Sequence, residues 1–158
     1  MLATMSNTNF SPSSLSAAQQ ALAPIADDMI AVDQILHKEL SDSQSPKIAE
    51  VGNYIIEAGG KRMRPALLML MARALGYDGT QHRELGATIE MLHTATLMHD
   101  DVVDEGMMRR GRPTANAQWG NSIAVLVGDF MYTRSFQMMV RIGNLQVMQA
   151  LAKAANIL

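Results

Sequence analysis

Cysteine is absent from the 158-residue sequence. This absence excludes a disulfide framework and a zinc site built on thiolates, and it is compatible with the reducing cytoplasm, where we expect the protein to reside. Long hydrophobic runs are missing too. The longest uninterrupted apolar run, Ala66 to Ala72, is far shorter than the roughly 20 residues of a membrane-spanning helix. We therefore predict no transmembrane segment.

Positive charge is missing from the N-terminus, because Met1 to Pro24 contains no Lys or Arg and therefore lacks the cationic region of a signal or transit peptide. We predict a flexible leader over residues 1–24. The 48% hydrophobic content predicts one domain, over residues 25–158, with a single core. A net charge of −2 argues against a general polyanion binder, so we expect no nucleic-acid partner.

Helical periodicity dominates the rest of the chain and predicts an all-α protein. The stretch from Pro65 to Leu75 is almost wholly apolar, so we expect a buried helix with Pro65 at its first position. A longer helix follows and ends at a group of acids. The predicted helices cover residues 25–40, 47–58, 65–75, 81–104, 115–119, 122–141 and 145–158.

The acidic end of the long helix carries the strongest functional signal. On a helical wheel Asp104 lies about 40° from Asp100, Asp101 about 100° away and His93 about 20° away. Three carboxylates on one side repel each other unless a cation gathers their oxygens, and Mg²⁺ is held by one or two carboxylates together with substrate phosphates. The acids alone fit a magnesium site and a solvated helix end equally well.

Two basic clusters favour the first of these interpretations. Arg109 and Arg110 follow the acids, and arginines that fork onto phosphate oxygens complement carboxylates that hold a metal. The segment from Gly59 to Pro65 reads Gly-Gly-Lys-Arg-Met-Arg-Pro and places cations at the N-terminus of a helix, where an anion binds well. The alternative for this segment is a basic loop that caps two helices.

These three motifs together resemble those of the trans-isoprenyl diphosphate synthases. The resemblance implies an isoprenoid-synthase-type helical bundle around a central cavity, and a homodimer in the full-length protein. It implies that Asp100, Asp101 and Asp104 are catalytic and hold Mg²⁺ on the allylic prenyl diphosphate. Arg109 would contact that same diphosphate. The residues implied to bind isopentenyl diphosphate are Lys61, Arg64, His93 and Arg110.

The implied reaction condenses an allylic diphosphate with isopentenyl diphosphate into a long-chain polyprenyl diphosphate, a precursor of quinone side chains. The family's second aspartate-rich motif, with the lysine, threonine and glutamine that complete the site, belongs to a C-terminal half that this sequence does not contain. We therefore expect a fragment whose bundle is incomplete at the C-terminus and which is inactive alone. The alternatives are a non-catalytic regulatory or dimerising subunit and a class I terpene cyclase.

Product length is the last property that the sequence addresses. A growing chain anchored at Asp100 must run along the preceding turns of the helix, where the wheel places Thr96 about 40°, Leu92 about 80° and Ala95 about 140° from Asp100. In the family, the two positions before Leu97 form the floor of the product tunnel. Here they are Ala95 and Thr96, and their small size implies an open tunnel. Close packing of helices is the alternative reason for small residues.

Overall fold

The protein is described here by a computed structural model that covers residues 17–58 and 60–156, with side chains from Gln20 onward. Most of the predicted leader, Gly59 and the last two residues of the final predicted helix lie outside the described residues. The all-α class is confirmed. The elements are α1 (Ala17–Leu22), the 3-10 turn η2 (Ala23–Ile25), α2 (Ala26–Ser41), α3 (Pro46–Glu57), α4 (Met63–Ala74), α5 (Gln81–Val103), β1 (Met108–Arg109), β2 (Arg112–Pro113), α6 (Ala115–Trp119), α7 (Asn121–Ile142) and α8 (Leu145–Ala155).

Several helix boundaries differ from the sequence-based expectation by one or a few residues, and two of these differences affect its interpretation. Helix α1 begins at Ala17, so helical structure extends into the segment predicted as a leader. Helix α4 begins at Met63, so Pro65 is its third residue and not its first. Proline is tolerated there because the first four N–H groups of a helix have no intrahelical partner.

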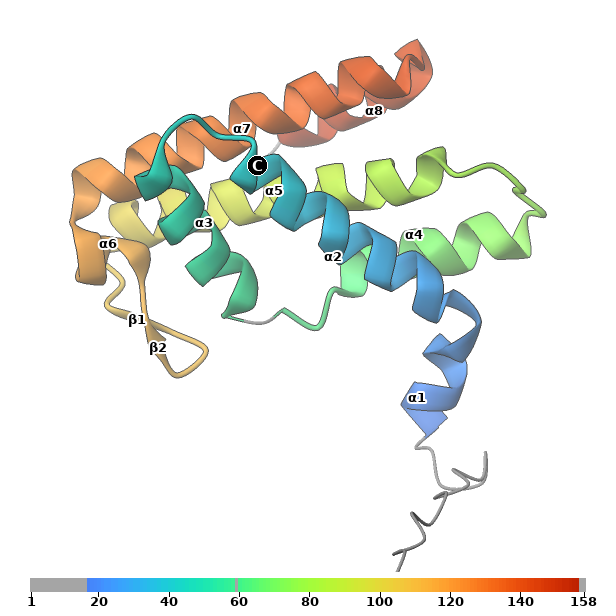
Figure 1. The fold of residues 1–158 in the computed structure, drawn as a ribbon, viewed down its shortest axis with the longest axis horizontal. Helices are drawn as coiled ribbons and strands as arrows, with labels where there is room; N and C mark the ends of the chain where they lie inside the picture. Colours follow the sequence, from blue (N-terminus) through green and yellow to red (C-terminus); the bar gives the residue numbers. More distant parts are fainter. Residues whose placement is uncertain (1–16, 59, 157–158) are drawn as a thin grey trace, which may run out of the picture.

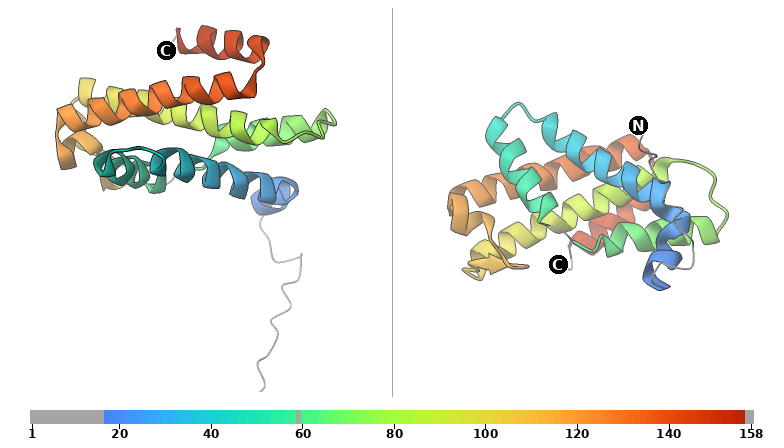
Figure 2. Two further views of the ribbon diagram at one scale, coloured as in Figure 1. Left: turned by 45° about the horizontal axis from the view of Figure 1, so that its top comes forward. Right: turned by 60° about the horizontal axis from the view of Figure 1, so that its bottom comes forward.

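Helices α5 and α7 run antiparallel through the centre of the molecule (Figure 1). Helices α2 and α3 lie on one side of this pair, and α8 lies on the other side against α7 (Figure 2). None of the helices in the described ranges has the length and hydropathy of a membrane-spanning segment.

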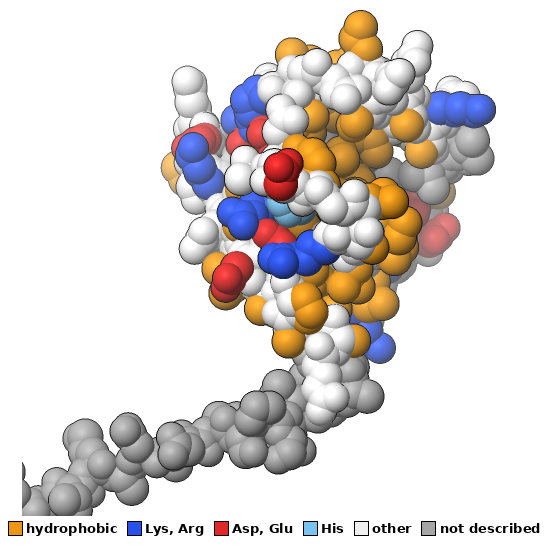
Figure 3. All heavy atoms as spheres, turned by 90° about the vertical axis from the view of Figure 1, so that its right-hand side faces the viewer, with side chains coloured by type: hydrophobic (Ala, Val, Ile, Leu, Met, Phe, Trp, Pro, Cys, Tyr) orange, Lys and Arg blue, Asp and Glu red, His pale blue; other side chains and the backbone are white. Residues whose placement is uncertain are grey.

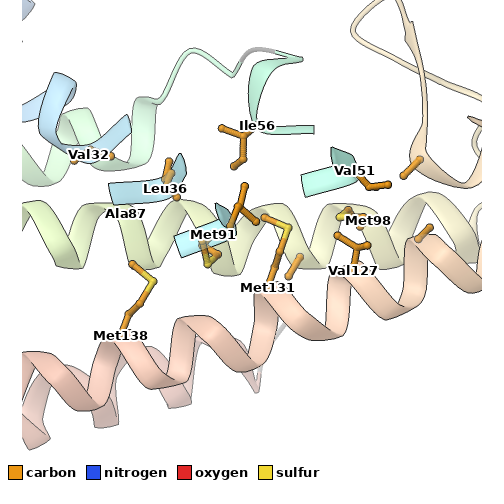
Figure 4. Close-up of a cluster of buried hydrophobic side chains, with 14 of the residues drawn as sticks. Val32, Leu36, Val51, Ile56, Ala87, Met91, Met98, Val127, Met131 and Met138 are labelled. Carbon is orange, nitrogen blue, oxygen red and sulfur yellow. The ribbon is translucent and has the colours of Figure 1, made fainter. Parts of the chain in front are cut away.

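The core forms where α2 and α3 meet the central pair. Methionines fill much of it, because an unbranched side chain adapts to the irregular space between crossing helices. Met91 and Met98 of α5 face Met131 of α7, and all three are at most 1% exposed. Figure 4 shows these side chains together with others from all four helices, namely Val32, Leu36, Val51, Ile56, Ala87, Val127 and Met138.

Helix α4 is not the buried helix that its composition predicts. Only Pro65, Ala66 and Met69 of α4 are buried, against α2 and α5. The opposite side of the helix carries a stripe with a spacing of four residues, and its members are 51–79% exposed: Met63, Leu67, Met71 and Leu75. Within the described chain, α4 is thus covered on one side only. Its apolar composition alone could not show whether one side or all sides would be covered.

Figure 3 shows one end of the molecule, where charged side chains gather between apolar ones. A buried acid, Asp28, joins three helices of the described chain. Asp28 of α2 has a side chain that is 3% exposed. It accepts hydrogen bonds from Arg83 Nε of α5 (2.8 Å) and Arg73 Nε of α4 (3.2 Å), and His82 Nε2 lies 3.5 Å from it. Burial alone would raise the pKa of Asp28, but the two arginine hydrogen bonds and the neighbouring positive charges lower it below its ordinary value.

Replacing Asp28 with Asn should lower the free energy of unfolding by about 2–4 kcal/mol at pH 7, because two guanidinium groups lose a buried carboxylate. A carboxylate whose pKa is lowered by folding stabilises the protein above its unfolded pKa of about 3.9, and that contribution is lost as the pH falls through the folded value. Urea unfolding at pH 7 and in acid measures both effects. Asp27→Asn is the matched control, because Asp27 lies in the same first turn of α2 but is exposed.

Candidate functional site

One face of α5 lines a narrow cavity of about 40 Å³. The residues that face it recur at helical spacing, so the cavity follows the helix from its middle to its acidic end. From α5 these are Glu90, His93, Thr94, Leu97, Met98 and Asp101, and they meet Arg62, Arg109 and Arg110 from other parts of the chain.

Asp101 and Arg109 form a bidentate ion pair at the acidic end of this cavity. Arg109 Nη2 donates to Asp101 Oδ1 at 2.8 Å, and its Nε lies 3.1 Å from both carboxylate oxygens. Asp101 is 8% exposed as a residue. The hydrogen bond to Asp101 raises the pKa of Arg109 above its ordinary value, with smaller contributions from the charges of Asp100 and Asp104. Arg109 is therefore held at the cavity with its charge fixed.

A short β-hairpin, which the sequence did not predict, carries Arg109 and Arg110. Each of its strands and its turn has two residues. Strands β1 and β2 pair antiparallel, and the turn between them is formed by Arg110 and Gly111 with φ of 52° and 77°. Positive φ at both turn positions is typical of a type I′ turn, which fits the twist of a tight hairpin. The turn thereby separates Arg109, which faces Asp101, from Arg110.

Polar contacts fix this hairpin to the helices around it. Asn116 Nδ2 donates to the carbonyl oxygens of Gly106 (2.9 Å) and Asp101 (3.2 Å). On the other side Tyr54 Oη of α3 donates to the carbonyl oxygen of Pro113 at 2.9 Å. The bond to Pro113 ties β2 to α3, and the bonds of Asn116 fix the segment between α5 and β1, so the arginines are held in a defined position relative to α5.

The three acids do not form the single cluster that the helical wheel predicted. Asp101 is turned inward to Arg109, whereas Asp100 and Asp104 are exposed and do not line the cavity. His93 was predicted to lie beside Asp100, but it lines the cavity with Asp101. Within the described residues no group of three or more acidic, histidine or cysteine side chains could hold a metal ion. A partner across the cavity decided the direction of Asp101, and the wheel contains no such information.

Asp100 and Asp104 nevertheless suit a magnesium ion that takes further ligands from phosphate. They lie one turn apart at the end of α5, where Asp104 is the C-cap, so their carboxylates stand at the negative end of the helix dipole. Acids are unfavourable there unless a cation compensates them. Mg²⁺ commonly takes one or two carboxylates from the protein and its remaining ligands from substrate phosphates and water. Two carboxylates therefore suffice for a magnesium site of this kind, whereas a site made of protein ligands alone would need more.

A second, broader cavity of about 420 Å³ adjoins the first and is basic. Lys61, Arg64 and Arg110 are exposed around it, and His93 is half-buried in its wall. The structure thus brings together the four residues that the family resemblance implies for a single diphosphate. Four residues line both cavities, namely Arg62, Glu90, His93 and Arg110.

His93 is poised at the boundary between the two cavities. Burial lowers its pKa below the ordinary 6.5, and the positive charge of Arg64 lowers it further. Glu90 acts in the opposite direction, and Arg110 and Arg109 add to the lowering. His93 is therefore neutral at pH 7, and an anion in the basic cavity would offset the charges that keep it so.

Inorganic diphosphate should raise the pKa of His93, because it screens the surrounding cations. An NMR titration of the histidine ring signals, with and without diphosphate, measures this shift. His37 is the control, since it bonds to Asn53 and lines neither cavity. A His93 pKa that stays constant in saturating diphosphate would contradict the prediction.

Without ligand, the free energy of unfolding should decline as the pH falls below about 6.5. The reason is that the histidine of the unfolded chain binds the proton more readily than His93 in the folded protein.

Sequence reasoning missed several residues that shape the site. The sequence motifs include Arg62 only as part of a basic run, and they do not include Glu90. Asn116 and Tyr54 carried no local signal, because their roles depend on contacts between distant segments. Glu90 carried one indication of a role in the site, because it is a charged residue at a position of α5 that is buried.

The residues predicted to form the product-length wall lie apart from both cavities. Ala95 is fully buried in the core, and Leu92 is 6% exposed. Thr96 is partly exposed, and its hydroxyl donates to the carbonyl oxygen of His93 at 2.8 Å. Ala95 therefore faces the core, while Thr96 lies toward the side of α5 that carries exposed Asp100.

The molecule is thus an all-α protein with two adjoining cavities beside α5, one that ends at the Asp101–Arg109 pair and one that is basic. Comparison with known proteins places it more closely. Residues 45–158 match the family profile described as polyprenyl synthetase, and the chain belongs to this family. It is 50% identical over 133 residues to an octaprenyl diphosphate synthase of Escherichia coli, an alignment that covers 84% of this chain and 41% of that protein.

Solved structures agree with this assignment. A decaprenyl diphosphate synthase from Rhodobacter capsulatus matches with a TM-score of 0.84 and 50% identity, over 88% of this chain and 43% of that one. A polyprenyl synthase from Caulobacter crescentus, in complex with calcium and isoprenyl diphosphate, matches with a TM-score of 0.85 and 35% identity, over 89% and 43%. The chain thus spans about two fifths of the length of these relatives.

Proposed function

We propose that this chain provides the two diphosphate-binding regions of a Mg²⁺-dependent trans-polyprenyl diphosphate synthase. The observation that carries the proposal is the shared wall of the two cavities: one ends at the pair of Asp101 with Arg109, and the other opens among Lys61, Arg64 and Arg110. Condensation of two diphosphate substrates needs two adjoining anion sites, and this arrangement supports the proposal because its two cavities would provide one site each.

The basic cavity would bind isopentenyl diphosphate. Lys61 and Arg64 lie at the N-terminus of α4, whose free N–H groups add to the positive potential. Arg110 reaches the same cavity from the hairpin, and neutral His93 forms its inner wall. The acidic end would receive the allylic diphosphate. Asp100 and Asp104, with Asp101 behind them, would hold Mg²⁺, and Arg109 would contact phosphate oxygens directly.

Magnesium, when bound, neutralises charge on the departing diphosphate. Arg109 would stabilise that same charge from a position fixed by Asp101. The allylic carbon–oxygen bond breaks and its electron pair leaves with the diphosphate. The isopentenyl double bond then forms the new carbon–carbon bond with the allylic cation, and a proton is lost to restore a double bond. Repetition lengthens the product by one isopentenyl unit at a time.

The product would be a long-chain polyprenyl diphosphate, a precursor of quinone side chains, since the relatives named above include octaprenyl and decaprenyl synthases. The Caulobacter relative, crystallised with calcium and isoprenyl diphosphate, supports a divalent cation beside a prenyl diphosphate. The active protein would be a cytoplasmic homodimer that also contains the region matching the rest of these relatives. A class I terpene cyclase uses one diphosphate, so the separate basic cavity argues against that alternative, and a purely dimerising subunit would need neither cavity.

Binding of isopentenyl diphosphate to this chain, measured by isothermal titration calorimetry, tests the proposal. Lys61→Ala should weaken binding at least about tenfold, because a direct charge-assisted contact is lost. Lys47→Ala is the matched control, since Lys47 is an exposed lysine on α3 whose ion-pair partner among the described residues is Glu50 of the same helix. Equal affinities for the wild type and Lys61→Ala would overturn the assignment of the basic cavity.

A further inference from the structure

Arg62 occupies the centre of the basic segment, yet its side chain points away from solvent and is 15% exposed. Its guanidinium binds three separate helices. Nε donates to Asp33 Oδ1 of α2 at 3.1 Å, Nη1 to Glu90 Oε1 of α5 at 3.2 Å, and Nη2 to the carbonyl oxygen of Ile56 in α3 at 2.9 Å. A residue with all three of these contacts is placed to support the site more than to bind a ligand itself.

The backbone of Arg62 shows the same constraint. Its φ of 46° is left-handed, a conformation that is unfavourable for a residue other than glycine. The three contacts hold the backbone in this turn. Lys61 lies directly before this turn and Arg64 lies after it in α4. The turn therefore sets how these two cations are placed, and both border the basic cavity.

Glu90 is the buried carboxylate whose charge Arg62 compensates. Its side chain is 7% exposed and borders both cavities, so it is a buried negative charge beside sites for anions. The packing around Gly60 is tight: a Cβ atom there would lie 3.3 Å from Glu90 Oε1 and 2.9 Å from Arg110 Nη1. Without a compensating cation, this carboxylate would oppose any diphosphate in the cavity and would draw neighbouring cations toward itself.

We propose that Arg62 is a positioning residue that neutralises Glu90 and fixes the turn between Lys61 and Arg64, so that the cations of the basic cavity face a diphosphate without an opposing charge. This inference rests on the proposed function only for the identity of the ligand. It predicts that Arg62 acts through Glu90, which a direct ligand would not do.

A double-mutant cycle with inorganic diphosphate as the probe tests this dependence. Arg62→Ala should weaken diphosphate binding at least about tenfold, because Glu90 is left buried and unpaired. Arg62→Ala combined with Glu90→Gln should restore the affinity to within about threefold of the wild type. Glu90→Gln alone should not weaken binding. If the double variant binds as weakly as Arg62→Ala, Arg62 is a direct ligand and the proposal is overturned.

The pKa of His93 provides a readout that needs no ligand. In Arg62→Ala the unpaired charge of Glu90 should raise it, and Glu90→Gln in the same chain should lower it again. A His93 pKa unchanged in Arg62→Ala would count against the proposal. If the wild-type chain binds no diphosphate, the proposed function is overturned, while this titration still decides the role of Arg62.

Two further variants guard against a purely structural explanation. Arg134→Ala is the matched control, because Arg134 is 18% exposed and pairs with Glu39, a glutamate 8% exposed, away from both cavities. It should leave diphosphate affinity within about twofold of the wild type, and a loss as large as that in Arg62→Ala would overturn the proposal. If Arg62→Ala does not fold, Arg62→Lys takes its place, since one ammonium cannot serve all three acceptors, and Glu90→Gln should again restore binding.

Discussion

Asp100→Asn and Asp104→Asn should each lower Mg²⁺-dependent prenyl transfer by about 10²- to 10³-fold, the usual effect of removing one element that stabilises developing charge. The measurement requires the active form, in which this chain is joined to the region that its relatives contain beyond it. Lys61→Ala and Arg110→Ala should instead raise the KM for isopentenyl diphosphate. Identical defects toward both substrates would mean that the two cavities do not have distinct ligands.

Asp100→Asn and Asp104→Asn should also stabilise the chain when no metal is bound. Asp100 and Asp104 stand at the negative end of α5, and each neutral replacement removes an unfavourable charge worth about 0.3–1 kcal/mol. Thermal unfolding of the 158-residue chain without metal measures this gain. Glu105→Gln is the matched control: Glu105 is exposed just beyond α5, and its replacement should stabilise the chain without a loss of transfer. Asp variants that lose both stability and activity would indicate a structural role for these acids.

Helix positions could be predicted from sequence because periodicity and caps are local signals. The helix predicted from residue 145 illustrates this, since the structure has α8 begin at Leu145, where the side chain of Asn144 accepts from the N–H groups of Gln146 and Val147. The basic cavity was predictable for a similar reason. Lys61 and Arg64 are close in sequence, so the fold of one short segment places both beside the same cavity.

The remainder of the site depends on contacts between segments far apart in the chain. A helical wheel gives the angle between Asp100 and Asp101 but not which of them meets Arg109. Arg62 depends on Asp33 and Ile56, which lie on other helices. The stripe of α4 that contains Leu67 is exposed because burial depends on the neighbouring elements and not on composition alone.

Substitutions at two neighbouring small residues on α5, Ala95 and Thr96, would distinguish a product tunnel from close helix packing. Ala95 is fully buried in the core, so Ala95→Phe should overpack it and destabilise the chain by about 1–3 kcal/mol or more. Thr96 is partly exposed, and Thr96→Phe should change stability by no more than about 0.5–1 kcal/mol, including loss of the hydroxyl bond to His93. Unfolding of the two variants measures this difference.

In the active form Thr96→Phe should shorten the polyprenyl product. A chain that grows from an allylic diphosphate at Asp100 runs toward the preceding turn of α5, and a ring at Thr96 would stand in its way. Chromatography of the products, normalised to total transfer, measures the change. Leu92→Ala on the same side of the helix, one turn further back, is the complementary variant and should leave the product at least as long as in the wild type. Unchanged products from a stable Thr96→Phe enzyme would place the growing chain on another face of α5 and leave the small residues as a consequence of helix packing.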